Sequence, residues 1–244
     1  VAMFGGSTTY YGKPPIIELV HNIISDQGID IEVFNFGSLS SNHTQHVHRL
    51  LEFSDRFKFD LVIFYGGYNE TLQYAIYDPR PGYPYNFFFR NELNPLMQSL
   101  LRYSSILGTL DLVLGGSLSG LKKLKLTFMD SNWKDEIVAN YWRDLTLASE
   151  LVTHIVEPNM CKKPSFLSIT QPAGNPNTQI ESQVWTQLIE SATTFNLAWR
   201  HVDLSEMAAE VEFTDTIHLT QNSRAIMASE IASIVEEVYQ ENCR

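Results

Sequence analysis

The stretch Val1-Ala2-Met3-Phe4-Gly5-Gly6-Ser7-Thr8-Thr9 opens the chain with four apolar residues, two glycines and a serine. An apolar run bounded by turn residues predicts a buried strand over Val1–Phe4 and a tight turn at Gly5–Thr8. A helical pattern follows, because Pro14 suits the first turn of a helix and apolar residues then recur on one side as far as Asp26. The unit of strand, turn and helix therefore predicts an α/β protein.

The same unit recurs along the chain. Further strands are expected at Ile31–Phe36, Asp60–Tyr65, Phe166–Thr170 and Trp199–Val202, and further helices around Val47–Leu51 and at Asp135–Val156, Val184–Phe195 and Ala225–Tyr239. Strands that are apolar throughout and alternate with amphipathic helices indicate a parallel sheet covered on both faces. We therefore expect a three-layer α/β/α sandwich with a five-stranded parallel sheet in the flavodoxin-like order. Functional sites in such sheets form beyond the carboxyl ends of the strands.

Length, composition and charge limit the classes of protein. The chain has 244 residues, 44% of them hydrophobic, which suits one domain over residues 1–244 with an inserted cap or loop after the third strand, at about 72–130. A net charge of −11 argues against a nucleic-acid partner, since binding phosphates requires a basic face. It also argues against adsorption to anionic lipid through charge alone. No run of 18 apolar residues predicts a membrane-spanning helix.

Two features bear on localisation. The chain starts at Val1 inside an apolar run, which predicts that a signal, an anchor or another domain was removed upstream and slightly favours an envelope-associated or secreted protein. A short natural leader or a chosen cloning boundary explains this start equally well. Cys161 and Cys243 lack the spacing of metal ligands and either form one bridge or are both free.

Residues suited to catalysis follow three of the predicted strands. Ser7 follows the first strand, where a nucleophile stands clear of the sheet. Gly37 follows the second and Asn69 the third. A free backbone N–H and an amide side chain both suit stabilisation of an oxyanion. Each of these turns is also ordinary loop chemistry, because glycine and asparagine favour turns for backbone reasons.

Asp215 and His218 precede the last predicted helix and are three residues apart. At this spacing the carboxylate can accept a hydrogen bond from one imidazole nitrogen and leave the other to take a proton from a serine. In the alternative interpretation Asp215 caps a turn and His218 packs.

In order, Gly5-Gly6-Ser7, Asn35-Phe36-Gly37, Gly66-Gly67-Tyr68-Asn69 and Asp215-Thr216-Ile217-His218 resemble the four sequence blocks of the SGNH (GDSL-type) hydrolase superfamily. The segment Leu219–Ile234 is similar to that family's closing helix, so the resemblance spans essentially the whole chain. It implies that Ser7 is the nucleophile, His218 the base and Asp215 its orienting partner. It also implies three oxyanion donors, which are the N–H of Ser7, the N–H of Gly37 and the side-chain amide of Asn69.

The chain departs from the family pattern at two positions. Gly6 stands where the family usually has aspartate, and Glu70 follows Asn69 where aspartate is usual. Neither departure removes a group that the mechanism uses directly. The Gly-Gly-Ser-Thr form is interpreted as the mark of a subgroup.

The other histidines are expected to have no catalytic part. His43, His46 and His48 lie close together, but no cysteine or carboxylate cluster accompanies them and the helical pattern spreads them over different faces. We therefore expect solvated surface residues, and neither a metal nor a cofactor. His21, His154 and His201 belong to no constellation.

The insertion has an aromatic part and an apolar part. Tyr74, Tyr77, Tyr83 and Tyr85 lie among prolines, where they can stack on sugar rings or line an acyl pocket, or else pack the insertion on the core. Residues 93–129 are apolar and broken by glycines. A docked helical hairpin is favoured there over a cap or a membrane-contacting surface, and membrane contact through this part or an upstream segment stays open.

These patterns predict a serine esterase that hydrolyses a short acyl ester, for example an acetyl ester, on a small molecule or a carbohydrate. The alternative is an O-acyltransferase with the same triad. A non-catalytic carbohydrate-binding module is disfavoured, because nothing structural demands the serine, histidine, aspartate, glycine and asparagine together. The natural substrate and the oligomeric state stay open.

Overall fold

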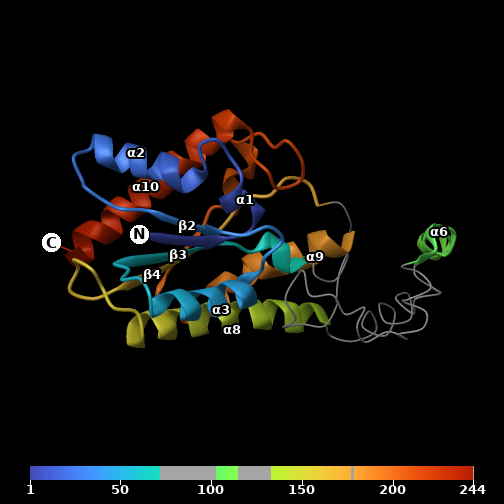
Figure 1. Ribbon diagram of the computed structural model, residues 1–244, viewed down its shortest axis with the longest axis horizontal. Helices are drawn as coiled ribbons and strands as arrows, with labels where there is room; N and C mark the ends of the chain where they lie inside the picture. Colours follow the sequence, from blue (N-terminus) through green and yellow to red (C-terminus); the bar gives the residue numbers. More distant parts are fainter. Residues whose placement is uncertain (72–102, 115–132, 177–178, 244) are drawn as a thin grey trace.

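The computed structural model describes residues 1–71, 103–114, 133–176 and 179–243 (Figure 1). Its centre is one sheet of five parallel strands: β1 (Ala2–Gly5), β2 (Phe34–Gly37), β3 (Leu61–Gly66), β4 (Ser165–Thr170) and β5 (Arg200–Asp203). The strand order is β2-β1-β3-β4-β5. The flavodoxin-like order predicted from the sequence is therefore confirmed.

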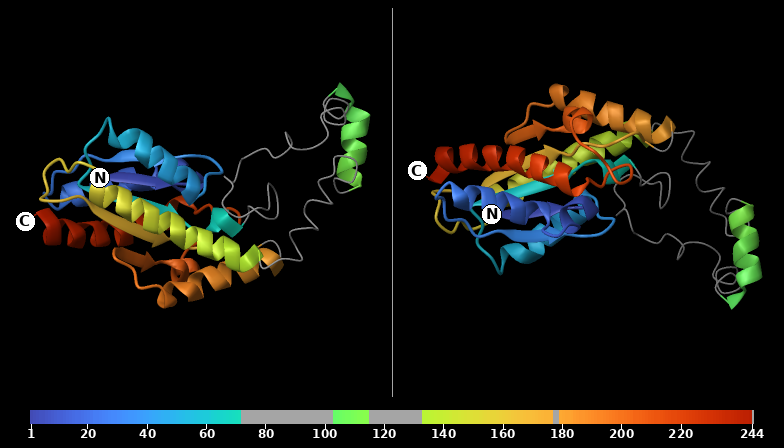
Figure 2. Two further views of the ribbon diagram at one scale, coloured as in Figure 1. Left: turned by 90° about the horizontal axis from the view of Figure 1, so that it is seen from below. Right: turned by 90° about the horizontal axis from the view of Figure 1, so that it is seen from above.

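Helices cover both faces of this sheet (Figures 1 and 2). On one face α2 (Ile16–Asp26) packs against α10 (Gln221–Cys243). On the other face α8 (Trp133–His154) packs between α3 (His43–Ser54) and α9 (Gln179–Ser191). The predicted three-layer α/β/α sandwich is confirmed. Short helical segments also occur at α1 (Ser7–Tyr10), at residues 68–71, and at η2 (Ala192–Thr194) and η3 (Ser205–Ala209).

The apolar opening run is buried because β1 is a central strand. Successive side chains of a strand point to opposite faces, so Phe4 enters the core under α3 and α8 while Met3 enters the core under α2 and α10. Phe4 stacks on Phe36 of β2, with ring centroids 4.8 Å apart. Both cores therefore require apolar side chains from the same strand.

Several element boundaries differ from the expectation. Helix α9 spans Gln179–Ser191 where Val184–Phe195 was expected, and two further differences have a clear structural cause. Strand β2 begins at Phe34 and not at Ile31, because the register pairs Ala2 with Phe34 and residues 31–33 lie outside the ladder. Helix α10 begins at Gln221, four residues before Ala225. The Thr220 hydroxyl accepts the N–H of Ser223 and so caps the helix at this earlier point.

Cys161 and Cys243 form a disulfide, which decides between the two alternatives that the sequence left open. The bridge joins the segment after α8 to the end of α10. Among the described residues, no helix is long and apolar enough to cross a membrane.

Only residues 103–114 of the expected insertion are described. They contain helix α6 (Ser105–Val113), on which Ile106 and Val113 are exposed. The expected substrate-binding residues Tyr74, Tyr77, Tyr83 and Tyr85 lie outside the described residues.

Candidate active site

Ser7 stands at the carboxyl end of β1, where α1 begins. The two glycines before it are required by close approach. A Cβ on Gly5 would lie 1.9 Å from Oγ1 of Thr9, and a Cβ on Gly6 would lie 2.3 Å from Nδ2 of Asn69. The Gly-Gly-Ser turn therefore lets the Asn69 amide lie directly beside the backbone that leads into Ser7.

The fold brings Ser7, His218 and Asp215 together across 211 positions of sequence. Nε2 of His218 lies 2.8 Å from Oγ of Ser7, and Nδ1 of His218 lies 2.6 Å from Oδ2 of Asp215. The serine–imidazole distance lies within the roughly 3.5 Å expected for a nucleophile and its base. This chain of two hydrogen bonds can pass the serine proton to the imidazole and stabilise the resulting imidazolium.

Asp215 is fixed by its own turn. Its Oδ1 accepts hydrogen bonds from the N–H groups of Ile217 and His218, each at 2.9 Å, while Oδ2 accepts from the imidazole. Partial burial raises the pKa of Asp215, but the hydrogen bonds from His218 and Ile217 outweigh it and hold the pKa below its ordinary value. Asp215 therefore both shapes the turn and orients the imidazole, whereas the sequence presented these as alternatives.

Asn69 follows β3, and its amide faces Gly6. Nδ2 donates to the carbonyl oxygen of Ser41 at 2.7 Å. Since an amide nitrogen carries two hydrogens, this bond fixes the side chain and leaves one hydrogen for a ligand. Asn69 therefore has an amide hydrogen that the Ser41 bond does not use, next to the backbone that leads into Ser7.

Gly37 does not present a free N–H. Its N–H donates to Oδ1 of Asn35 at 2.9 Å, and a Cβ on Gly37 would lie 2.6 Å from the N of Tyr10, so this glycine packs beneath α1. Ser40 in the following loop has φ 50, a left-handed conformation that favours glycine, and its N–H has no hydrogen-bond partner among the described residues. Ser40 therefore suits a donor role better than Gly37. No pattern in the sequence indicates this, because serine is not a residue type that favours left-handed turns.

Two aromatic side chains that the sequence analysis overlooked border the site. The ring of Tyr11 packs edge-on to the His218 ring, with centroids 5.6 Å apart, and Tyr10 packs on Tyr11 at 5.4 Å. Both tyrosines are 51% exposed. Their positions in the sequence could have indicated this, since they lie three and four residues after Ser7 and therefore about one helical turn away from it.

The expectation of solvated histidines is wrong for His43 and His46, each of which is 1% exposed, and holds for His48. His43, His46, Val47 and Leu50 follow the i, i+3, i+4, i+7 spacing of one helix face, which α3 turns toward the sheet. His201 also has polar partners, because its Nδ1 lies 2.8 Å from Oγ of Ser168. Among the described residues, no group of three or more histidines, cysteines or carboxylates is placed to hold a metal ion.

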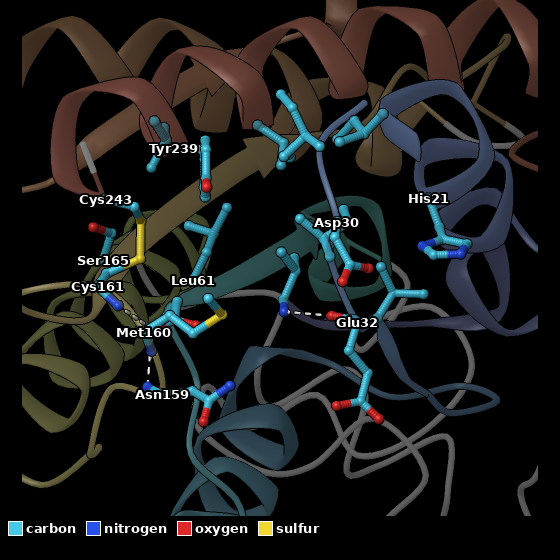
Figure 3. A pocket seen from close by; sticks show the side chains of 18 of the residues that line it. His21, Asp30, Glu32, Leu61, Asn159, Met160, Cys161, Ser165, Tyr239 and Cys243 are labelled. Carbon is cyan, nitrogen blue, oxygen red and sulfur yellow. Dashed lines mark hydrogen bonds between the residues drawn. A yellow bond between two sulfur atoms is a disulfide. The ribbon is translucent and has the colours of Figure 1, made fainter. Parts of the chain in front are cut away.

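A cavity of about 520 Å³ opens at the other end of the sheet, beside the amino ends of β1 and β3 (Figure 3). His21, Asp30, Glu32 and Tyr239 line it, and the disulfide lies in its wall. Here Oδ1 of Asp60 accepts the N–H groups of residues 159, 160 and 161 at 2.7–2.9 Å. These polar groups support the wall, and Ser7 lies at the opposite, carboxyl ends of the strands.

Comparison with known proteins supports the fold. No family model matches the sequence, and no curated protein sequence matches it. Three solved structures are similar over nearly the whole of both chains. A carbohydrate acetylesterase family member from Sinorhizobium meliloti is 10% identical, with a TM-score of 0.54 and 97% of each chain covered. The aryl esterase of M. smegmatis is 14% identical, with a TM-score of 0.55 and coverage of 97% of this chain and 98% of that one.

The third is a member of the lipolytic protein G-D-S-L family from Veillonella parvula DSM 2008. It is 12% identical, with a TM-score of 0.53 and 96% of each chain covered. At these identities the similarity concerns the fold. Together with the strand order and the two helical layers, it shows that this chain has the SGNH (GDSL-type) hydrolase fold.

Proposed function

We propose that this protein is a serine esterase in which Ser7, His218 and Asp215 form the catalytic triad. The observation that carries the proposal is the continuous chain of hydrogen bonds from Oγ of Ser7 through His218 to Asp215, at 2.8 and 2.6 Å. Serine hydroxyls are weak nucleophiles until an adjacent base takes the proton, and this arrangement supplies the base and its orienting carboxylate.

In the proposed reaction, Oγ of Ser7 attacks the acyl carbonyl carbon while Nε2 of His218 takes the hydroxyl proton. The imidazolium then gives that proton to the leaving alcohol oxygen as the ester bond breaks. Water attacks the acyl-serine in the second half, with His218 again as base, and releases the acid and free Ser7. Asp215 keeps Nδ1 protonated throughout and stabilises the imidazolium. The residues present require neither metal nor cofactor for these steps.

The tetrahedral oxyanion needs hydrogen-bond donors near Ser7. We assign the N–H of Ser7, the second amide hydrogen of Asn69 and the N–H of Ser40 to this task, with Ser40 in place of Gly37. The close approach of Asn69 to Gly6 and its bond to the Ser41 carbonyl support this assignment. Donors held before the reaction begins stabilise the developing charge without reorganisation.

We further propose a short acyl ester on a carbohydrate as the substrate class. Tyr10 and Tyr11 support it, because two half-exposed tyrosine rings beside the catalytic imidazole can stack on a sugar ring. The carbohydrate acetylesterase of similar fold is consistent with this class. The side chain of His218 is 29% exposed. Water can therefore reach the imidazole, which favours hydrolysis over transfer of the acyl group to a second sugar.

The proposal is tested with chromogenic esters whose acyl chains have two to twelve carbons and with acetylated sugars, each with and without a free sugar as acyl acceptor. Ser7→Ala is expected to abolish turnover and labelling by a fluorophosphonate. Ser54→Ala is the matched control, because within the described part of the chain Ser54 Oγ donates only to the Leu51 carbonyl of α3. Retention of turnover by Ser7→Ala would refute the triad. An acylated sugar as the main product would replace hydrolysis by transfer.

A further inference from the structure

Asn69 and Glu70 together hold the start of α3 at two points. Nδ2 of Asn69 donates to the carbonyl oxygen of Ser41, and the N–H of His43 donates to Oε1 of Glu70, both at 2.7 Å. Asn69 and Glu70 are consecutive in the helical residues 68–71 that follow β3, and the two backbone groups that they bind are two residues apart. The loop that contains Ser40 and Ser41 is therefore held to this helical segment by two neighbouring hydrogen bonds.

Glu70 is almost fully buried, with 4% of its surface exposed. The N–H of His43 belongs to the first turn of α3 and has no partner within the helix, so the carboxylate satisfies a donor that the helix leaves open. Negative charge is stabilised at the N-terminus of a helix. The other carboxylate oxygen, Oε2, is buried and has no hydrogen-bond partner among the described residues. Burial of a carboxylate costs free energy, so the burial of Glu70 indicates that it has a structural or functional role here.

The groups around Glu70 come from two helices. His43 faces it from α3, and its Nδ1 also lies 3.1 Å from Nδ1 of His46, so one of these two imidazoles donates and the other accepts. Tyr141 and Asp144 face it from α8. Among the described residues no lysine or arginine forms an ion pair with Glu70; its nearest basic atom in an ion-pair contact is Nδ1 of His43, at 3.8 Å.

Burial sets the ionisation of this cluster. It raises the pKa of Glu70 to about 7, against the lowering effect of the His43 N–H. It lowers the pKa of His43 to about 4, against the opposing effect of Asp144, and it lowers the pKa of His46 well below the ordinary value. Glu70 therefore changes charge near neutral pH while the two histidines stay neutral.

We propose that Glu70 is a positioning residue whose ionised carboxylate holds the Ser40–Ser41 loop against Asn69 and so sets the geometry of the oxyanion hole. This inference rests on the proposed function. Protonation of the carboxylate leaves a neutral acceptor for the His43 N–H, and a neutral hydrogen bond is weaker than a charge-assisted one. The position of the loop, and with it the stabilisation of the oxyanion, then depends on pH through Glu70 in addition to the base His218.

The test compares kcat and KM of the unaltered protein, Glu70→Gln and Glu70→Asp from pH 5.5 to 8. Glu70→Gln keeps the shape and an acceptor oxygen but never ionises. Asp60→Asn is the matched control, because Asp60 also binds backbone N–H groups with its carboxylate but does so at the far end of the sheet. The same ester is tested with Ser7→Ala, which separates failure of this inference from failure of the proposed function.

Glu70→Gln is expected to lower kcat about tenfold at pH 8 and much less at pH 5.5, with KM changed less than about threefold. Asp60→Asn is expected to lower the melting temperature and leave kcat and its pH profile unchanged. A ratio of unaltered to Glu70→Gln kcat that is constant across this pH range would overturn the inference, as would an unchanged kcat. If Glu70→Gln does not fold, Glu70→Asp decides: reduced kcat with the pH dependence retained supports the inference, and kcat equal to that of the unaltered protein overturns it.

Discussion

Adding one methyl group at position 6 tests how Asn69 and Ser7 work together. The Cβ of Gly6→Ala would lie 2.3 Å from Nδ2 of Asn69, about 1 Å short of ordinary contact at 3.4 Å. Gly6 has φ −77, which alanine adopts without strain, so the added methyl acts through the contact and not through the backbone. The amide of Asn69 must therefore move by about 1 Å, which takes Nδ2 away from its 2.7 Å bond to the Ser41 carbonyl.

A donor displaced by this distance loses most of its effect on the oxyanion. Removal of one such donor typically lowers kcat by about 10²- to 10³-fold, or roughly 3–4 kcal/mol. We therefore expect Gly6→Ala to lower kcat about 100-fold. The methyl group is expected to act only through Asn69, so the double variant Gly6→Ala/Asn69→Ala should be no slower than Asn69→Ala alone.

The assay is steady-state hydrolysis of a chromogenic acetate ester by the two single variants, the double variant and the unaltered protein, with melting temperatures measured in parallel. Gly28→Ala is a control, because a Cβ at Gly28 would contact nothing within 4 Å, although its φ of 81 is expected to lower stability without changing kcat. Additive losses in the double variant would refute the reasoning, since they would mean that Gly6→Ala damages the site without moving Asn69.

Three further predictions concern the triad, the buried cluster and the disulfide. Asp215→Asn should lower kcat by about 10⁴-fold, because the amide can no longer hold the imidazole in the tautomer that accepts the serine proton; a loss below tenfold in steady-state kinetics would contradict this. The folded pKa of Glu70, about 7, lies above its ordinary 4.5, so its contribution to the free energy of unfolding is complete below about pH 4.5 and is lost as the pH rises to about 7. The pKa of His43 shifts the other way, from 6.5 to about 4, so its contribution is lost as the pH falls through this range. Urea unfolding should therefore show Glu70→Gln gaining about 3 kcal/mol relative to the unaltered protein from pH 4.5 to 7.5, and a constant difference would count against the burial argument. The paired change Cys161→Ser/Cys243→Ser opens a bridge between residues 82 positions apart and should lower the free energy of unfolding by about 4 kcal/mol with kcat unchanged; a loss below 1 kcal/mol in denaturant unfolding would argue against the bridge.

The architecture could be predicted because its signals are local. Each strand of a sheet covered on both faces must be apolar throughout, and each covering helix must have an apolar side, so the alternation is written along the chain. The boundaries were less accurate. Strand β2 is shorter than its apolar run because pairing with β1 begins at Phe34, and that register is a property of two segments more than 30 residues apart.

The candidate site divides in the same way. Asp215 and His218 could be paired from the sequence because they lie only three positions apart, within one turn. Ser7 was placed with them only through the order of the four motifs and the rule that strand ends converge. Ser40 was not predicted because its left-handed backbone results from the path of the loop, and its residue type does not indicate it. His43 and His46 were misassigned because the polarity of histidine was given more weight than the helical stripe that they share with Val47 and Leu50.

The sequence by itself determined the sandwich, the strand ends at which to look and the residue types suited to ester hydrolysis, because hydrophobic periodicity and turn chemistry act over a few residues. Only the tertiary structure decided that the Asn69 amide lies against Gly6, that Cys161 and Cys243 pair, and that Glu70 lies buried at the start of α3. These features depend on distances between segments far apart in the chain. The close approach of Asn69 to Gly6 is the clearest case: two short motifs 63 positions apart fit together only because β1 and β3 are neighbours in the sheet.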